Sequence, residues 1–201
     1  MSNNRKEEIV LVTLELAAQK GLVNVSMNMI ADKIGIKKPS LYKHFASKEE
    51  IVESMYAFLR KQAKEKENIK PIDYSTLFEG KTAFEVLCVV VYGYIQMNHQ
   101  EQMLNFYRVI YSERSLEPMA AKIVAEETKN MINATRQLFY ALEVHKLLHF
   151  ENPDMSALSF AMTIHGLMDY ELDQSNGECS DESDKNLLED YLKWFCEENA
   201  I

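Results

Sequence analysis

A short run of basic and hydroxyl-bearing side chains is the part of this sequence best suited to bind a polyanion. Its members are Lys37, Lys38, Ser40, Tyr42, Lys43 and His44, with Pro39 among them. Ammonium, hydroxyl and imidazole groups donate hydrogen bonds to phosphate oxygens, and lysine also bonds to base edges in the major groove of DNA. The run therefore predicts contact with a nucleic acid.

A helix-turn-helix is the element that would present these side chains. Its first helix, capped by Ser26 and ended by Gly35, is marked by apolar residues at helical spacing: Ile30, Ala31 and Ile34. A turn over residues 35–37 leads into a second short helix, residues 38–44. The major groove is about 12 Å wide and admits one helix, so a tight turn must brace the second helix against the first. An ordinary corner between two helices, without a role in DNA binding, is the alternative.

The neighbouring segments complete a small helical head. A first helix ends at Gly21, and its apolar face consists of Ile9, Thr13, Leu16 and Ala17. Ile36 and Leu41 can anchor the second helix of the helix-turn-helix inward. A fourth helix begins with the capping box Ser47–Glu50 and runs into a charged stretch, which a linker at residues 68–75 follows.

The order of these motifs resembles the N-terminal domain of TetR-family transcriptional regulators. The resemblance runs from Ile9 to Glu50 and is carried by Gly21, Met29-Ile30-Ala31, Ile34-Gly35-Ile36, Leu41-Tyr42-Lys43-His44-Phe45 and Ser47-Lys48-Glu49-Glu50. It implies a homodimer whose three-helix heads read a palindromic operator in double-stranded DNA. A fourth helix would join each head to a helical body that encloses a pocket for a small-molecule effector. Most members of the family repress transcription, so we expect a repressor that its effector releases from DNA, without a cofactor.

Position by position, the resemblance implies a set of DNA contacts. Residues that would face the groove are Lys38, Pro39, Ser40, Lys43 and His44, and residues that would hold backbone phosphates are Ser26, Tyr42 and Lys48. Base reading would rest chiefly on Lys38, Ser40 and Lys43, because phosphate contacts fix register without reading sequence. Lys37 departs from the family pattern, which often has a small hydroxyl there. The departure weakens the helix cap and makes a further phosphate contact available.

Charge is divided unevenly along the chain. The whole sequence carries −9 with a pI near 5.1, which taken alone argues against a nucleic-acid-binding protein. Residues 1–70, however, hold 13 lysines and arginines against 9 acidic residues, a balance of +4 that leaves −13 for the remainder. Charges farther away than a Debye length of about 8 Å are largely screened, so a basic head can still bind phosphates.

The remainder of the chain has the pattern of a helical body. Glycine and proline are scarce, with 6 and 4 in all, and apolar positions recur at helical spacing. Helices are expected at 81–98, 101–113, 117–149, 153–173 and 184–199, with an acidic loop at 174–184. We therefore predict an all-α protein of about nine helices. Its parts are a DNA-binding domain (1–48), a connecting helix and linker (49–75), and an effector-binding and dimerisation domain (76–201).

The last two predicted helices carry more apolar surface than one core-facing stripe requires. Packing against a second copy of the chain in a four-helix seam would cover this surface. The residues predicted for that interface are Leu158, Met162, Leu187, Leu188, Tyr191, Leu192 and Phe195. The alternative is that both helices close the core of the monomer.

Methionines and aromatic residues of the body would suit an adaptable cavity for an apolar or aromatic effector. The residues predicted to line it are Tyr92, Phe106, Tyr107, Tyr111 and His165, and His99 is a further histidine within reach. A filled core would use the same residue types. A body without a cavity would favour a DNA-binding regulator controlled by a protein partner.

Catalytic motifs are missing from the sequence: GxSxG, HExxH, GxxxxGK[ST] and GxGxxG do not occur. His145 and His149 have a spacing that suits a metal, but the local sequence supplies no third ligand. We therefore predict neither an enzyme nor a metal site. A helical enzyme or metal-binding protein with an incidental helical corner is the competing interpretation.

The sequence also predicts a compartment. An odd number of cysteines suits reduced thiols, and they are Cys88, Cys179 and Cys196. The polar start has no signal-peptide pattern, and the longest apolar run, residues 86–95, is shorter than the roughly 20 residues that span a bilayer. We expect a cytoplasmic protein that does not contact a membrane.

Overall fold

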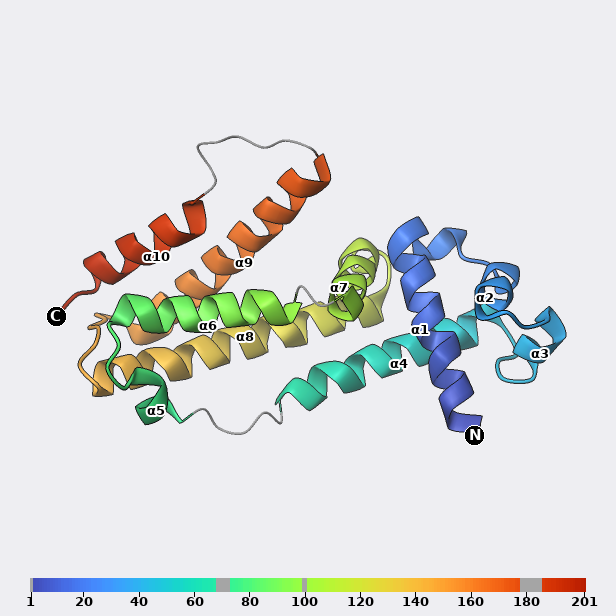
Figure 1. The fold of residues 1–201 in the computed structure, drawn as a ribbon, viewed down its shortest axis with the longest axis horizontal. Helices are drawn as coiled ribbons and strands as arrows, with labels where there is room; N and C mark the ends of the chain where they lie inside the picture. Colours follow the sequence, from blue (N-terminus) through green and yellow to red (C-terminus); the bar gives the residue numbers. More distant parts are fainter. Residues whose placement is uncertain (1, 68–72, 99–100, 178–185) are drawn as a thin grey trace. The chain divides into compact units, whose positions relative to one another are not determined.

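The computed structural model describes residues 2–67, 73–98, 101–177 and 186–201, and every regular element among them is a helix (Figure 1). The elements are α1 (Ser2–Lys20), the 3-10 helix η1 (Leu22–Asn24), α2 (Met27–Ile34), α3 (Lys38–Tyr42), α4 (Lys48–Glu67), α5 (Tyr74–Phe78), α6 (Ala83–Asn98), α7 (Glu101–Glu113), α8 (Pro118–Val144), α9 (Pro153–Gly177) and α10 (Leu187–Glu198). The all-α prediction is confirmed, with ten α-helices described where about nine were expected. None of the described helices has the length and apolar character needed to cross a lipid bilayer.

Contacts divide these helices into two compact units. The first contains α1 to α4, α7 and the start of α8 as far as Glu127, and the second contains α5, α6 up to Met97, the rest of α8, α9 and α10. The functional boundaries predicted after residues 48 and 75 remain predictions. The first unit nevertheless draws on α7, because this helix packs against α1.

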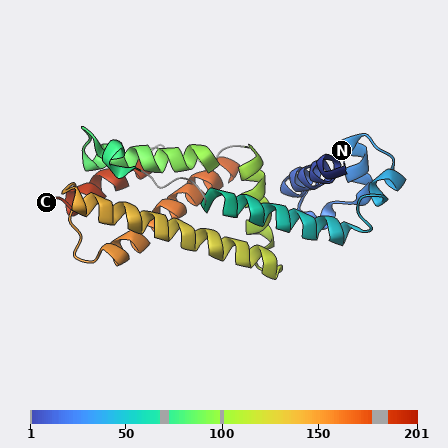
Figure 2. The same cartoon turned by 90° about the horizontal axis from the view of Figure 1, so that it is seen from below.

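The first unit is organised around α1, which contacts α2, α4 and α7 (Figure 2). All four residues predicted for the inner face of α1 are buried: Ile9, Thr13, Leu16 and Ala17. The Thr13 hydroxyl donates a hydrogen bond of 2.7 Å to the carbonyl oxygen of Ile9, which satisfies the buried polar group. Gly21 then ends the helix region with a positive φ of 77°.

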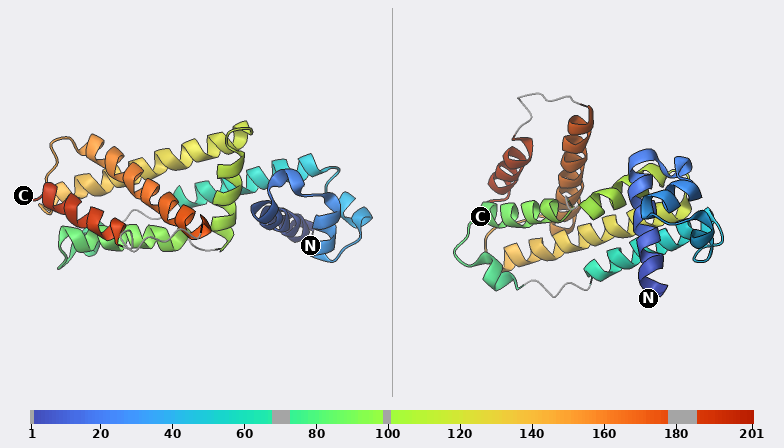
Figure 3. Two further views of the ribbon diagram at one scale, coloured as in Figure 1. Left: turned by 90° about the horizontal axis from the view of Figure 1, so that it is seen from above. Right: turned by 45° about the vertical axis from the view of Figure 1, so that its right-hand side comes forward.

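The second unit is built on a cluster of phenylalanines from α8, α9, α10 and the segment after α8. Phe139 stacks on Phe150 with ring centroids 4.5 Å apart, and Phe160 lies 4.7 Å from Phe195. Leu192 is completely buried beside them. In this unit α10 runs alongside α9 (Figure 3).

Several predicted boundaries in the second unit need correction. Helix α8 ends at Val144 rather than 149, because Lys146 adopts a φ of 55° and the chain turns back so that Phe150 enters the core. Helix α9 continues to Gly177, four residues past the predicted end, so the predicted acidic loop begins as helix. The rest of that loop, including Cys179, lies within residues 178–185, which are outside the described residues, as is His99.

The sequence prediction missed one helix in the segment predicted to be a linker. Helix α5 begins after Asp73, whose carboxylate accepts hydrogen bonds from the Ser75 backbone N–H at 3.1 Å and the Thr76 hydroxyl at 2.8 Å. The Ser75 hydroxyl also donates to this carboxylate, and its hydrogen bond, followed by that of the Thr76 hydroxyl, lowers the pKa of Asp73. The remainder of the predicted linker, residues 68–72, lies outside the described residues.

Removing a phenylalanine from the cluster should leave a cavity in the second unit and destabilise it. Phe139→Ala should lower the free energy of unfolding by about 3–5 kcal/mol, because a fully buried aromatic side chain is removed from a packed core. Urea denaturation followed by the fluorescence of Trp194, the only tryptophan, reports on this unit. Val144→Ala, at an exposed position of the same helix, should change the free energy of unfolding by less than about 0.5 kcal/mol. Equal effects of the two substitutions would contradict this packing.

Candidate nucleic-acid interface

The turn between α2 and α3 has the tight geometry that the sequence predicts. The Ser26 hydroxyl oxygen accepts a hydrogen bond from the Met29 N–H at 3.3 Å, so Ser26 caps α2 as expected. Gly35 ends the helix in the left-handed region with φ 76°, and the N–H of Ile36 donates to the carbonyl oxygen of Ala31 at 3.0 Å. The chain therefore reverses immediately after α2, and α3 packs against it.

Helix α3 is short and is held from its inner side. It ends at Tyr42, two residues before the predicted end, and the N–H groups of His44 and Phe45 both donate to the carbonyl oxygen of Leu41 in the turn that follows. Leu41 is 0% exposed and Phe45 is 2% exposed. These two side chains hold the inner face of α3 in the core of the first unit.

The outer face of α3 carries the cluster of residues predicted to bind DNA. Lys37, Lys38, Pro39, Tyr42 and Lys43 are exposed, while Ser40 and His44 are half-buried. Lys37 precedes the helix in an extended conformation without a side-chain cap, as expected for a residue that replaces a small hydroxyl. The Lys38 ammonium lies 6.0 Å from the centre of the Tyr42 ring, within range of a cation–π contact.

The lysines on this face carry unneutralised charge. Within the described part of the chain, none of Lys37, Lys38 and Lys43 forms an ion pair with a carboxylate. Lys33, which lies on α2, is by contrast paired with Glu15 of α1 at 2.8 Å and ties the two helices together. The face around α3 is therefore the part of the helix-turn-helix available to an anion.

Lys48, which was predicted to contact a DNA phosphate, forms hydrogen bonds within the protein. Its ammonium donates hydrogen bonds to two carbonyl oxygens of η1, to Leu22 at 2.8 Å and to Val23 at 3.3 Å. These bonds tie the first residue of α4 to the segment between α1 and α2. The predicted phosphate contact of Lys48 remains a prediction and would require these bonds to be exchanged or shared.

The start of α4 is fixed by the predicted capping box. The N–H of Glu50 donates to the Ser47 hydroxyl oxygen at 3.3 Å, and the Glu50 carboxylate accepts from the N–H of Ala46 at 2.6 Å. The carboxylate thus reaches the residue before the cap. Backbone and Ser47 hydrogen bonds also lower the pKa of the neighbouring Glu49. Helix α4 therefore starts at a well-defined point behind the helix-turn-helix.

Residues predicted to line an effector pocket fall into both compact units. Phe106, Tyr107 and Tyr111 belong to α7 in the first unit, where Phe106 is buried and lies edge-on to Tyr107 at 4.9 Å. Tyr92 and His165 belong to α6 and α9 in the second unit. The structure therefore does not bring the five together within one unit, and Phe106 is a core residue of the first.

The predicted dimer interface must be corrected at three positions. Leu188, Leu192 and Phe195 point into the phenylalanine cluster of their own unit and are buried there, so they are unavailable to a second copy. The remaining predicted residues differ in exposure: Met162 and Leu187 are exposed, and Leu158 and Tyr191 are half-buried. Met155, Tyr170, Leu172 and Trp194 are further exposed apolar side chains of α9 and α10, which were not among the residues predicted for the interface.

The two histidines that are four residues apart, His145 and His149, contact different side chains. His145 lies edge-on to Phe78 at 5.0 Å, while His149 lies 3.6 Å from the Glu143 carboxylate. In the described ranges, no group of three or more histidine, cysteine or acidic side chains is placed to hold a metal ion.

A helix-turn-helix with an unneutralised basic face, joined to further helices, defines a class of DNA-binding regulators. Residues 9–55 match the sequence model of the family described as "Bacterial regulatory proteins, tetR family". The N-terminal segment is therefore similar to the DNA-binding domain of TetR-family regulators, and the whole chain has the fold of a TetR-family transcriptional regulator. TetR-family transcriptional regulators are DNA-binding regulators and not enzymes.

Similarity in sequence to a known repressor covers the N-terminal segment, whereas similarity in structure to known regulators covers almost the whole chain. The chain is 42% identical over 53 residues to the HTH-type transcriptional repressor KstR2 of Mycobacterium tuberculosis, a match that covers 26% of each chain. A TetR-family regulator from Mesorhizobium loti superposes over 100% of this chain and 99% of its own, with 19% identity and a TM-score of 0.69. A transcriptional regulator from Saccharomonospora viridis in complex with choline covers 98% and 97%, with 18% identity and a TM-score of 0.66.

Gly35 has a left-handed backbone conformation, so a side chain at this position should destabilise the protein. Gly35→Ala should lower the free energy of unfolding by about 1–2 kcal/mol, because φ is 76° and the penalty is conformational. The space around a new Cβ is open at Gly35 and equally open at Gly166 in α9. Because Gly166 lies within a helix, the matched change Gly166→Ala should raise the free energy of unfolding by about 0.5–1 kcal/mol. Stabilisation by both changes, measured by urea denaturation, would rule out the left-handed turn.

Proposed function

We propose that this protein is a homodimeric transcriptional repressor in which α3 of each copy enters the major groove of a palindromic operator. The observation that carries the proposal is the exposed, unneutralised basic face of α3, held outward by the buried Leu41 and Phe45. Lys38, Ser40 and Lys43 would read base edges, and Lys37, Tyr42 and Ser26 would hold phosphates. His44 and Pro39 would pack at the groove, and such a regulator acts in the cytoplasm.

Palindromic binding requires two heads at a fixed separation. Half-sites one duplex turn apart place the two α3 helices about 34–36 Å from one another, and a two-fold dimer supplies this spacing. Exposed apolar side chains on α9 and α10 support a dimer seam there. The residues that we assign to it are Leu158, Met162, Leu187, Tyr191 and Trp194.

Repression and release by an effector are the finer parts of the proposal. The match to KstR2 supports repression, although it spans about a quarter of that repressor. The Saccharomonospora viridis regulator, which shares the fold, binds choline, which supports a small-molecule effector here too. An effector would release the protein by favouring a state whose head separation does not fit the operator, and the shift cannot exceed its differential affinity for the two states.

Selection from a random duplex library tests the proposal directly. The purified protein should enrich a short palindrome, and its affinity for the winning sequence should exceed its non-specific affinity by at least about a thousandfold. Enrichment of no sequence, together with binding weaker than about 10⁻⁶ M at physiological salt, would overturn it. Effector carried through purification is excluded first by refolding the protein from denaturant.

The salt dependence of binding identifies phosphate contacts. Lys37→Ala should reduce the slope of log affinity against log salt by about 1 per protomer, because one fewer counterion is released. Lys129→Ala removes the same charge from an exposed position on α8 in the second unit and should leave the slope unchanged. Equal slopes for both variants would show that Lys37 does not touch phosphate.

The proposed seam can be tested without DNA. Met162→Glu should raise the dimer dissociation constant by about 100-fold or more, because two-fold symmetry buries two unpaired charges in one interface. Val144→Glu introduces the same charge at an exposed apolar position on α8 and should have little effect. Sedimentation equilibrium measures both. A dimer that tolerates Met162→Glu as well as Val144→Glu would exclude α9 from the interface.

A further inference from the structure

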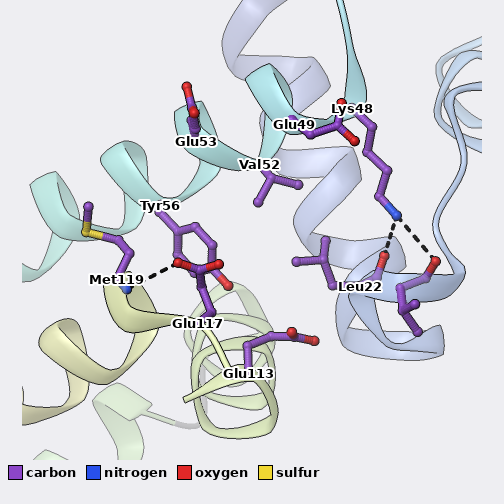
Figure 4. Close-up of a pocket in the computed structure, with 10 residues that line it drawn as sticks. Leu22, Lys48, Glu49, Val52, Glu53, Tyr56, Glu113, Glu117 and Met119 are labelled. Atoms are coloured by element: carbon purple, nitrogen blue, oxygen red, sulfur yellow. Dashed lines mark hydrogen bonds between the residues drawn. The ribbon is translucent and has the colours of Figure 1, made fainter. Parts of the chain in front are cut away.

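An acidic groove lies in the first unit, where η1 and the start of α4 face the turn between α7 and α8 (Figure 4). Its volume is about 560 Å³. Four carboxylates line it: Glu49 and Glu53 from α4, Glu113 from the end of α7, and Glu117 from the turn before α8. The groove is thus large enough for a small molecule and carries a concentrated negative charge.

The carboxylates of the groove have no paired cation in the described part of the chain. Lys48 is the one basic residue among the lining side chains, and its ammonium is directed to the carbonyl oxygens of Leu22 and Val23. None of the four carboxylates forms an ion pair with any residue that the structure describes. The carboxylate of Glu117 accepts a hydrogen bond from the backbone N–H of Met119, at 3.3 Å.

A second, independent feature is the hydroxyl of Tyr56. Tyr56 lines the groove and is 3% exposed, yet its hydroxyl is buried without a hydrogen-bond partner among the described residues. In Figure 4 its ring lies between α4 and the side chains of Glu113 and Glu117. Burial, followed by these two carboxylates, raises the pKa of Tyr56, which stays a neutral phenol. A buried hydroxyl without a partner is costly, so a ligand that bonds to it gains free energy.

Apolar side chains form the rest of the groove walls and restrict the class of ligand that the groove can bind. Leu22, Val52 and Met119 are apolar residues that also line the groove. A bare metal ion would need several oxygen ligands converging on one point, and no such group occurs in the described part of the chain. Carboxylates beside apolar walls suit a molecule with one cationic end and one apolar end.

We propose that this groove binds a small organic cation, an ammonium group on an apolar body. Glu113 and Glu117 would accept charge-assisted hydrogen bonds from the ammonium, and the Tyr56 oxygen would accept a further one. Leu22, Val52 and Met119 would cover the apolar body. The aromatic ring of Tyr56 adds a face on which a cation is attracted.

The location of the groove links it to the helix-turn-helix. A ligand there contacts both α4 and η1, the two segments that Lys48 ties together immediately behind α2. If the proposed repressor function holds, on which this step alone rests, occupancy would change operator affinity by shifting the start of α4. Binding of the cation itself does not depend on DNA.

Calorimetric titration with 2-phenylethylamine tests the site, with the neutral analogue 2-phenylethanol as the matched probe. The amine should bind saturably, and at least about tenfold more tightly than the alcohol, because only the amine forms charge-assisted bonds. Glu113→Gln should weaken amine binding by about tenfold for the same reason. Glu198→Gln removes one exposed charge from α10, outside the groove, and should bind like the parent protein.

Tyr56→Phe separates a ligand-binding hydroxyl from a structural one. The variant should bind the amine several-fold more weakly, while its unfolding temperature without the amine should be unchanged or higher, since an unpaired buried hydroxyl has been removed. A fall in unfolding temperature would reveal a structural partner and overturn the role of Tyr56. Equal binding of amine and alcohol, no saturable binding of the amine, or binding insensitive to Glu113→Gln would each overturn the site.

The titrations contain no DNA, so their outcome is independent of whether the protein is a repressor. Repeating the operator-binding measurement with saturating amine then tests the regulatory step. A change in operator affinity in the parent protein that disappears in Glu113→Gln supports the link. Unchanged affinity would remove the regulatory step and leave the binding site intact.

Discussion

Burial of Leu41 and Phe45 is the interaction on which the DNA-binding face depends. Helix α3 has five residues, far below the length of about 12–15 residues at which an isolated helix becomes stable in water, so its conformation comes from tertiary packing. The two buried side chains fix which face of α3 is inward and therefore which side chains point outward. Because the lysines occupy the outer positions, the same packing that stabilises the helix creates the basic surface.

The segment behind the helix-turn-helix adds a second constraint through α4. The capping box fixes where α4 begins, and Lys48 uses its charge to tie that point to η1. Among the described residues, no cation forms an ion pair with Glu49 and Glu53 of the same helix or with Glu113 and Glu117. The acidic groove follows from the use of Lys48 as a structural clamp, within a unit whose N-terminal part is basic overall.

Local signals in the sequence predicted the helix-turn-helix well, because its geometry is set by residues close to one another. Ser26, Gly35 and the box at Ser47 each act through hydrogen bonds spanning three to five residues, and all three occur as expected. The end of α8 was predicted wrongly because Lys146 adopts left-handed backbone without being glycine. Helix α5 was missed because its few residues show no periodicity.

Longer-range features could not be predicted, because a periodic stripe does not identify what covers it. We predicted a dimer seam for the stripe containing Leu188, Leu192 and Phe195, with the monomer core as the alternative, and these three residues lie in the core of the second unit. The clamp from Lys48 to η1 joins residues 25 and 26 positions apart. Tyr56 gave no signal as an isolated aromatic residue, since its unpaired hydroxyl is a property of the folded unit.

Lysine acetylation footprinting of the unmodified protein, with and without its selected duplex, tests the central claim that α3 presents the DNA-binding surface. On addition of DNA the acetylation rates of Lys37, Lys38 and Lys43 should fall strongly, while that of Lys129 should not change. Lys48 should react slowly in both states, because its ammonium already donates two hydrogen bonds. Unchanged rates at Lys37, Lys38 and Lys43 while DNA is bound would show that another surface binds it and would contradict the account.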